Sequence, residues 1–264
     1  MPLTSPVRVG TALARAVVVA ALAAVALPAT SVQAAPPSAY SVAGVDTSHY
    51  SHGEHENERI DWNQVAKAHG FAFLKASQGP GAAGNDAWFA RDYAAVARTS
   101  LRHAPYHFFD PKSTTDGAAQ ARQFITVARA AGYRGDRTGE LPPVLDVEKV
   151  RRHRKEVCPA ALRPQQVAVF LREVRRAFGV APIVYTRASF VKECMSGDGR
   201  VFAGHRLWLA RYGSRAEEPQ PVPGAGRTWT FWQHTQHGRT PGIPGTGDRD
   251  VFRGSLAQLR DLAG

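Results

Sequence analysis

The chain has 264 residues, which fits one large domain or two small ones. Hydrophobic residues make up 44% and charged residues 21%, which excludes a disordered chain, 24 Gly without a strict triplet period exclude collagen, and two cysteines are too few for a disulfide-rich scaffold. The formal net charge of +11 favours an acidic partner, and composition alone leaves three: nucleic acid, an anionic membrane or an anionic wall polymer.

The N-terminal segment has the pattern of a secretory signal peptide. Arg8 and Arg15 come before an unbroken apolar run over residues 16–27, and small residues follow as far as Ala34. That run is short for a membrane span, which needs roughly 20 residues, so an uncleaved anchor is the less favoured alternative. We predict a cleaved signal peptide over residues 1–34, a short linker over residues 35–40, and an extracellular protein without stable membrane insertion.

Export changes what the charge and the cysteines mean. Removing residues 1–34 leaves 31 Lys and Arg against 22 Asp and Glu, a net charge of +9. A secreted protein meets cell envelopes more often than DNA, so a nucleic-acid partner is disfavoured. Export also places Cys158 and Cys194 in an oxidising compartment, where pairing is the usual outcome.

Strand-like and helix-like segments then alternate along the chain. Strands are predicted over residues 42–48, 71–76, 104–109, 143–148, 182–186, 206–210, 229–234 and 248–252. Helices are predicted over 61–70, from Asp86 through Val96, over 121–132 and 167–179, and from Ser255 onward. The regular first half predicts a parallel sheet, whereas three later connections look too short or too rich in Pro and Gly for helices. We predict an α/β fold, a single irregular (β/α) TIM-like barrel over residues 41–264.

Carboxylates fall where such a barrel places its active site, at the strand ends. Asp46 lies near the end of the first strand, Asp146 and Glu148 end the fourth, and Asp248 and Asp250 lie in the last. Strand residues i and i+2 point to the same face, roughly 7 Å apart, so burial and repulsion should raise the pKa of one member of the Asp146–Glu148 pair. A protonated acid beside an ionised carboxylate suits glycosidic cleavage, and the alternative is a solvated turn.

Aromatic residues support a sugar site at the same end of the barrel. The candidates lie in or just after predicted strands: Tyr106, Tyr185, Trp208, Tyr212 and Trp232. Flat rings at a barrel mouth stack on sugar faces, and Tyr hydroxyls bind sugar hydroxyls. Because inward and outward positions alternate along a strand, some of these rings must belong to the core.

Nine short blocks carry a family resemblance. They are GVDTSH at 44–49, IDW at 60–62, FLKASQG at 73–79, YHF at 106–108, LPPVLDVE at 141–148, PIVYT at 182–186, LWLARY at 207–212, WTFWQ at 229–233 and GDRD at 247–250. In number, order and spacing they resemble the lysozymes of glycoside hydrolase family 25. The resemblance covers the chain from about Val42 to the C-terminus.

The resemblance implies an N-acetylmuramidase on an irregular β/α barrel. Such enzymes cut the β-1,4 bond between N-acetylmuramic acid and N-acetylglucosamine in peptidoglycan, without a metal or organic cofactor. It implies that Glu148 is the general acid, that Asp146 assists at the anomeric side, and that Asp46 and Asp250 line the site. Either Asp146 attacks directly or it orients the substrate's own N-acetyl group, and the i, i+2 spacing favours the second route. A monomer acting on the anionic wall is expected.

Two features depart from the family pattern, and a third agrees with it. Gln78 stands where the family usually has Glu, and an amide keeps a hydrogen bond but not a charge. The Asn common two residues past Asp250 is missing, so Asp248 is retained as a further substrate-binding candidate. Cys158 and Cys194 fall where some secreted members carry a bridge.

Other readings remain. The spacing of His49, His52 and His55 resembles a metal site, but no apolar frame holds these residues, so none is predicted. The basic run over residues 151–155 either meets wall anions at the rim of the site or is a solvated loop. The rival functions are a catalytically impaired wall-binding module and a glycosidase for another N-acetylated polymer such as chitin.

Overall fold

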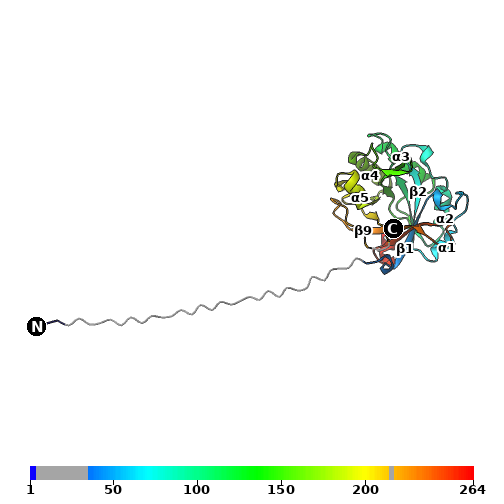
Figure 1. The fold of residues 1–264 in the computed structure, drawn as a ribbon. Coiled ribbons are helices and arrows are strands. Elements are labelled where there is room, and N and C mark those ends of the chain that lie inside the picture. Colours follow the sequence, from blue (N-terminus) through cyan, green and yellow to red (C-terminus); the bar gives the residue numbers. More distant parts are fainter. Residues whose placement is uncertain (4–34, 214–216) are drawn as a thin grey trace. The chain divides into compact units, whose positions relative to one another are not determined.

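Eight strands close into a barrel, which confirms the predicted α/β fold. The computed structural model describes residues 1–3, 35–213 and 217–264, and the last two ranges belong to one compact unit (Figure 1). The predicted signal peptide lies outside the described residues, except for residues 1–3. Among the helices of the described part, none is long and apolar enough to cross a membrane.

The barrel strands follow the predicted segments closely. They are β1 (Val42–Thr47), β2 (Phe71–Gln78), β3 (Arg102–Phe108), β4 (Val144–Asp146), β7 (Ile183–Thr186), β8 (Leu207–Ala210), β9 (Trp229–Gly238) and β10 (Gly247–Phe252). Their order around the barrel is β1-β10-β9-β8-β7-β4-β3-β2. Every neighbouring pair is parallel except β9–β10 and β10–β1, which are antiparallel. The connection between β9 and β10 is too short for the crossover that a parallel pair needs.

Helices cover the outside of the parallel part of the barrel (Figure 1). They are α1 (Trp62–Ala66), α2 (Phe89–Val96), α3 (Gly117–Ala130), α4 (Pro164–Phe178), α5 (Ala188–Cys194) and α6 (Leu256–Leu262), with short 3₁₀ turns at Pro37–Ala39, His49–Ser51, Ala82–Gly84 and Arg200–Phe202. As predicted, Gly179 ends α4, with a φ of 75° that favours glycine, and Ser255 caps α6.

Two local features differ from the sequence prediction. The first of the later connections contains α5, although no helix is predicted there. A small antiparallel hairpin, β5 (Val150–Arg152) with β6 (Lys155–Val157), directly follows the strand that carries the acid pair. Both elements are short, so their apolar residues are too few to produce a recognisable period.

Alternation along the strands divides the apolar core into two layers. On β2, Phe71 and Phe73 belong to the layer inside the barrel, whereas Ala72 and Leu74 belong to the layer between barrel and helices. The inner layer is aromatic, and Phe73 packs on Trp208 with ring centroids 4.5 Å apart. The same alternation brings Lys75 to the inner face, one step above Phe73 toward the barrel mouth.

The predicted cysteine pair forms a disulfide. Cys158 lies after β6 and Cys194 ends α5, 36 positions later in the sequence, with Cα atoms 5.3 Å apart. The bond therefore ties the segment after the hairpin to α5. Since a crosslink reduces the conformational entropy of the unfolded chain, we expect the Cys158→Ser/Cys194→Ser variant to lose about 3 kcal/mol of free energy of unfolding. Urea denaturation measures this loss, and a loss below about 1 kcal/mol would contradict the expectation.

Candidate active site

The predicted acids meet at one end of the barrel. Asp46 is near the end of β1, Asp146 ends β4, and Glu148 lies two residues beyond it. Because β10 is antiparallel to β1, its beginning reaches the same mouth, and Asp248 is the register partner of Asp46. Asp250 pairs with Gly44, two residues further along the strand and deeper in the barrel. The structure thus brings together all five carboxylates that the sequence predicts.

Asp46 and Asp250 are the most deeply buried of the five. Asp250 has no exposed surface and its Oδ1 accepts a 2.8 Å hydrogen bond from Trp208 Nε1. Burial, with repulsion from Asp248, raises the pKa of both carboxyls well above the usual range. The same burial raises the pKa of Asp248 to about 6. Both carboxyls therefore keep their protons to a higher pH than a solvent-exposed Asp does.

Asp146 is a buried carboxyl with spare hydrogen-bonding capacity. It is 6% exposed, and its Oδ1 has no hydrogen-bond partner among the described residues. Burial and then the neighbouring Glu148 raise the pKa of Asp146, while the cations of Lys75 and Arg187 oppose that rise. A buried acceptor without a partner is costly unless a ligand supplies a donor or a positive charge.

Glu148 stands nearer to solvent than Asp146. Its side chain is 21% exposed, and Oε2 lies 3.3 Å from Arg187 Nη2. Burial raises the pKa of Glu148 to about 7, while the Arg187 cation opposes the rise. Glu148 and Asp248 line a cavity of about 630 Å³. A carboxyl half-protonated near neutral pH at the wall of a cavity suits a general acid.

A hydrogen-bond network that the sequence does not predict fixes this end of the barrel. Gln233, from β9, donates to Asp46 Oδ2 at 2.6 Å and accepts from the Tyr185 hydroxyl at 2.8 Å. Tyr212 donates to the same oxygen of Gln233. The Arg187 guanidinium lies 4.9 Å from the centroid of the Tyr212 ring. Arg187 directly follows β7, and this strand-end position is the signal that identifies it in the sequence.

The aromatic candidates divide between site and core. Tyr185 and Tyr212 belong to the network, but Tyr106 and Trp208 are 8% and 2% exposed inside the barrel, so Trp208 reaches the site only through Asp250. The prediction that the Trp232 ring stacks on a sugar is wrong. It is 1% exposed, packs on Trp229 at 5.8 Å in the outer layer, and donates to a backbone carbonyl. Inward and outward positions alternate on β9, and Gln233 takes the inward one.

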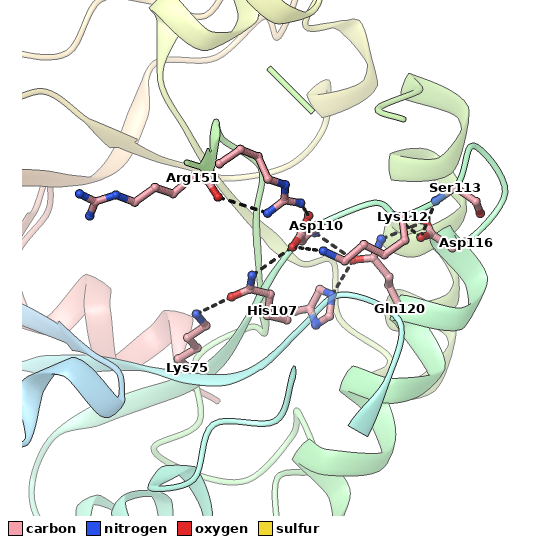
Figure 2. Close-up of polar contacts among 10 residues, drawn as sticks. Lys75, His107, Asp110, Lys112, Ser113, Asp116, Gln120 and Arg151 are labelled. Atoms are coloured by element: carbon pink, nitrogen blue, oxygen red, sulfur yellow. Dashed lines mark hydrogen bonds and ion pairs between the residues drawn. The ribbon is translucent and has the colours of Figure 1, made fainter. Parts of the chain in front are cut away.

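Gln78 belongs to a second polar network, of which Lys75, Asp110 and Lys112 are labelled in Figure 2. Its amide oxygen accepts from Lys75 Nζ at 2.9 Å, and its nitrogen donates to Asp110 Oδ2 at 3.1 Å. Asp110 also accepts from Lys112 at 2.7 Å and from Arg152 at 2.6 Å. Burial opposes ionisation of Asp110, but these hydrogen bonds hold its pKa below the usual range. Gln78 and Lys75 line a second cavity of about 490 Å³.

The histidines near β1 have structural contacts. His52 is fully buried, stacks on Trp88 with centroids 3.8 Å apart, and binds Asp92 at 2.9 Å. His49 binds Asp86 at 2.8 Å. Within residues 1–3, 35–213 and 217–264, no three His, Cys, Asp or Glu side chains form a group able to hold a metal ion.

Comparison with known proteins gives a consistent family. The family model "Glycosyl hydrolases family 25" matches residues 45–243. Lysozyme M1 of Streptomyces globisporus is 31% identical over 228 residues, which are 84% of this chain and 71% of that protein. The uncharacterized protein YegX of Escherichia coli K12 is 31% identical over 230 residues, 85% of this chain and 74% of that protein.

Solved structures agree. The bacterial lysozyme from Streptomyces coelicolor superposes with a TM-score of 0.71 at 30% identity, covering 84% of this chain and 96% of that one. A family GH25 lysozyme from Aspergillus fumigatus gives 0.68 at 27% identity, covering 84% and 99%. With the barrel and its acids, these matches show that the chain belongs to glycoside hydrolase family 25 and is a glycosidase of the lysozyme class.

Proposed function

We propose that the protein is a secreted lysozyme that hydrolyses the β-1,4 bond between N-acetylmuramic acid and N-acetylglucosamine in peptidoglycan. Glu148 is the general acid and Asp146 assists at the anomeric carbon. The observation that carries the assignment is the contrast between the two carboxyls. Glu148 borders the cavity and its pKa is about 7, whereas Asp146 is buried and one of its oxygens has no hydrogen-bond partner among the described residues.

The proposed reaction uses the two acids in different ways. Protonated Glu148 gives its proton to the glycosidic oxygen as the bond to the anomeric carbon breaks. Positive charge then develops on the sugar, and ionised Asp146 stabilises it or orients the N-acetyl group that attacks the anomeric carbon. Glu148, now ionised, takes a proton from the water that completes hydrolysis. Asp248, which lines the cavity, binds the sugar through hydrogen bonds, and Asp46 and Asp250 support it from deeper in the barrel.

The setting of this reaction is the outside of the cell. The signal peptide predicted over residues 1–34 and the Cys158–Cys194 disulfide both support export. After cleavage, residues 41–264 form the catalytic barrel, and the excess of basic residues attracts it to the anionic wall. That attraction should weaken as salt increases, because ions screen exposed charges.

The proposal is tested on bacterial wall suspensions. Purified protein should lower the turbidity and release new reducing ends in parallel. Release of free amino groups without reducing ends would mean that a peptide or amide bond is cut, and would overturn the proposal. Cleavage of chitin at a rate similar to that of wall glycan would favour the alternative of a broader glycosidase.

The pKa values set an expected pH dependence. Glu148 must be protonated to act, so kcat should fall as the pH rises through about 7. Asp146 must be ionised, and its raised pKa predicts an acid limb above the ordinary Asp range. We expect a bell-shaped profile of kcat on a soluble glycan fragment. A kcat that stays constant from pH 6 to 9 would contradict Glu148 as the acid.

A further inference from the structure

The β5–β6 hairpin has an unusual turn next to the proposed general acid. Arg152 pairs with Lys155, so the turn has two residues, His153 and Arg154, with φ values of 48° and 64°. Two-residue hairpin turns with both φ positive strongly favour Asn and Gly. Side chains such as those of His and Arg rarely adopt this conformation, and such strain concentrates at functional sites.

Neighbouring residues fasten the hairpin at both of its edges. Arg152 binds Asp110 at 2.6 Å, and Lys149, just before β5, binds Glu193 at 2.6 Å. Val150 is 2% exposed and anchors the first strand in the core. The charges of Lys149 and Arg152 are therefore paired within the protein, and the hairpin holds a defined position over the cavity.

Two arginines of the hairpin remain for a ligand. Arg151 and Arg154 both line the 630 Å³ cavity together with Glu148 and Asp248. Neither forms an ion pair with another described residue. The Arg151 side chain points away from Asp110 (Figure 2). Glu156, its register partner across the hairpin, also lines the cavity, so the hairpin contributes two cations and one acid to the lining.

We propose that Arg151 and Arg154 form a subsite for the carboxylates of the peptide stems that N-acetylmuramic acid carries. Guanidinium groups bind carboxylates through paired, charge-assisted hydrogen bonds. A stem is attached to the sugar whose bond is cut, so its carboxylates lie near the cavity wall that Glu148 shares. The subsite makes the enzyme prefer peptide-bearing glycan over neutral glycan. This inference rests on the proposed function.

The test compares two variants that each lose two positive charges. Arg151→Gln/Arg154→Gly removes the subsite, and glycine suits the positive φ of residue 154, so the turn should fold at least as well. The matched control, Arg122→Gln/Arg175→Gln, removes exposed arginines from α3 and α4. A third variant, Arg151→Lys/Arg154→Lys, keeps the charges. Thermal unfolding of each variant checks that the fold is retained.

Three substrates separate the possible anions. They are wall glycan with free stem carboxylates, the same glycan with these carboxylates amidated after the amines have been acetylated, and walls stripped of phosphate polymers by hydrofluoric acid. We expect Arg151→Gln/Arg154→Gly to lower kcat/KM about tenfold on untreated and phosphate-free glycan, mainly through KM, and less than about twofold on amidated glycan. The control should match the wild type throughout, and the lysine variant should recover part of the loss.

Each other outcome overturns the proposal. An equal loss on all three substrates would mean that the arginines act on Glu148 or on the sugar chain. A loss that disappears only on phosphate-free walls would identify phosphate as the anion. No loss of kcat/KM on any substrate would mean that the hairpin is a solvated loop without a ligand. Failure of the wild type to cleave any of the glycans would instead refute the proposed function itself.

Discussion

Replacing Glu148 with Gln is expected to lower kcat by about 10²–10⁴-fold, the usual contribution of a general acid. The amide has nearly the same shape as the carboxyl and fills the same space beside Arg187, but it has no acidic proton to give to the leaving oxygen. Release of reducing ends at pH 6 measures the effect. Near-native turnover of this variant would show that another group is the acid.

Two observations separate this effect from loss of folding or binding. Glu148→Gln should keep the thermal unfolding midpoint and should still sediment with wall fragments. Glu156→Gln is the matched control, because Glu156 lines the same cavity and acts on Glu148 only through the repulsion between their negative charges. We expect it to keep nearly full activity and to shift the alkaline limb of the pH profile slightly downward, since a neighbouring negative charge raises the pKa of Glu148.

Replacing Asp146 with Asn is expected to lower kcat by about 10²–10³-fold. Asn fills the same buried volume but cannot carry the negative charge that stabilises the developing cation or orients the N-acetyl group. The acid limb of the pH profile should disappear with the carboxyl that produces it. The comparison variant is Asp198→Asn, a substitution in a surface pair with Arg200.

The pH profile makes the Asp146 result decisive. A loss of kcat with an unchanged acid limb would mean that another acid, such as Asp248, titrates in that range. A loss of less than about tenfold would mean that the charge of Asp146 contributes little to the chemical step.

The barrel is largely predictable from the sequence because its apolar strands are separated by clear helical stripes. The stripe of α4, ended by Gly179, is one example of such a helix, and the buried apolar run that begins β2 at Phe71 is one example of such a strand. The antiparallel placement of β10 is not predictable in this way, because pairing direction depends on neighbours distant in sequence. Helix α5 is too short for its own periodicity to identify it.

The acids of the site are predictable for a related reason: strand ends of a barrel converge. Asp146 and Glu148 reach the mouth by following β4, and Asp248 reaches it through β10. Gln233 and Arg187 are harder to find. Arg187 has only its position directly after β7 as a signal, and Gln233 has none until the fold brings it to Asp46. Trp232 shows the opposite case: the sequence predicts it in the site, but it occupies an outward position on β9 and packs in the outer layer of the core.

The identity of the sugar at the new reducing end tests the central claim most directly. Digested peptidoglycan is reduced with borohydride and its fragments are analysed by mass spectrometry, beside a Glu148→Gln digest. Cleavage at the proposed bond predicts reduced N-acetylmuramic acid at every new end and no new ends with the variant. Reduced N-acetylglucosamine at the new ends, or equal cleavage by the Glu148→Gln variant, would contradict the account.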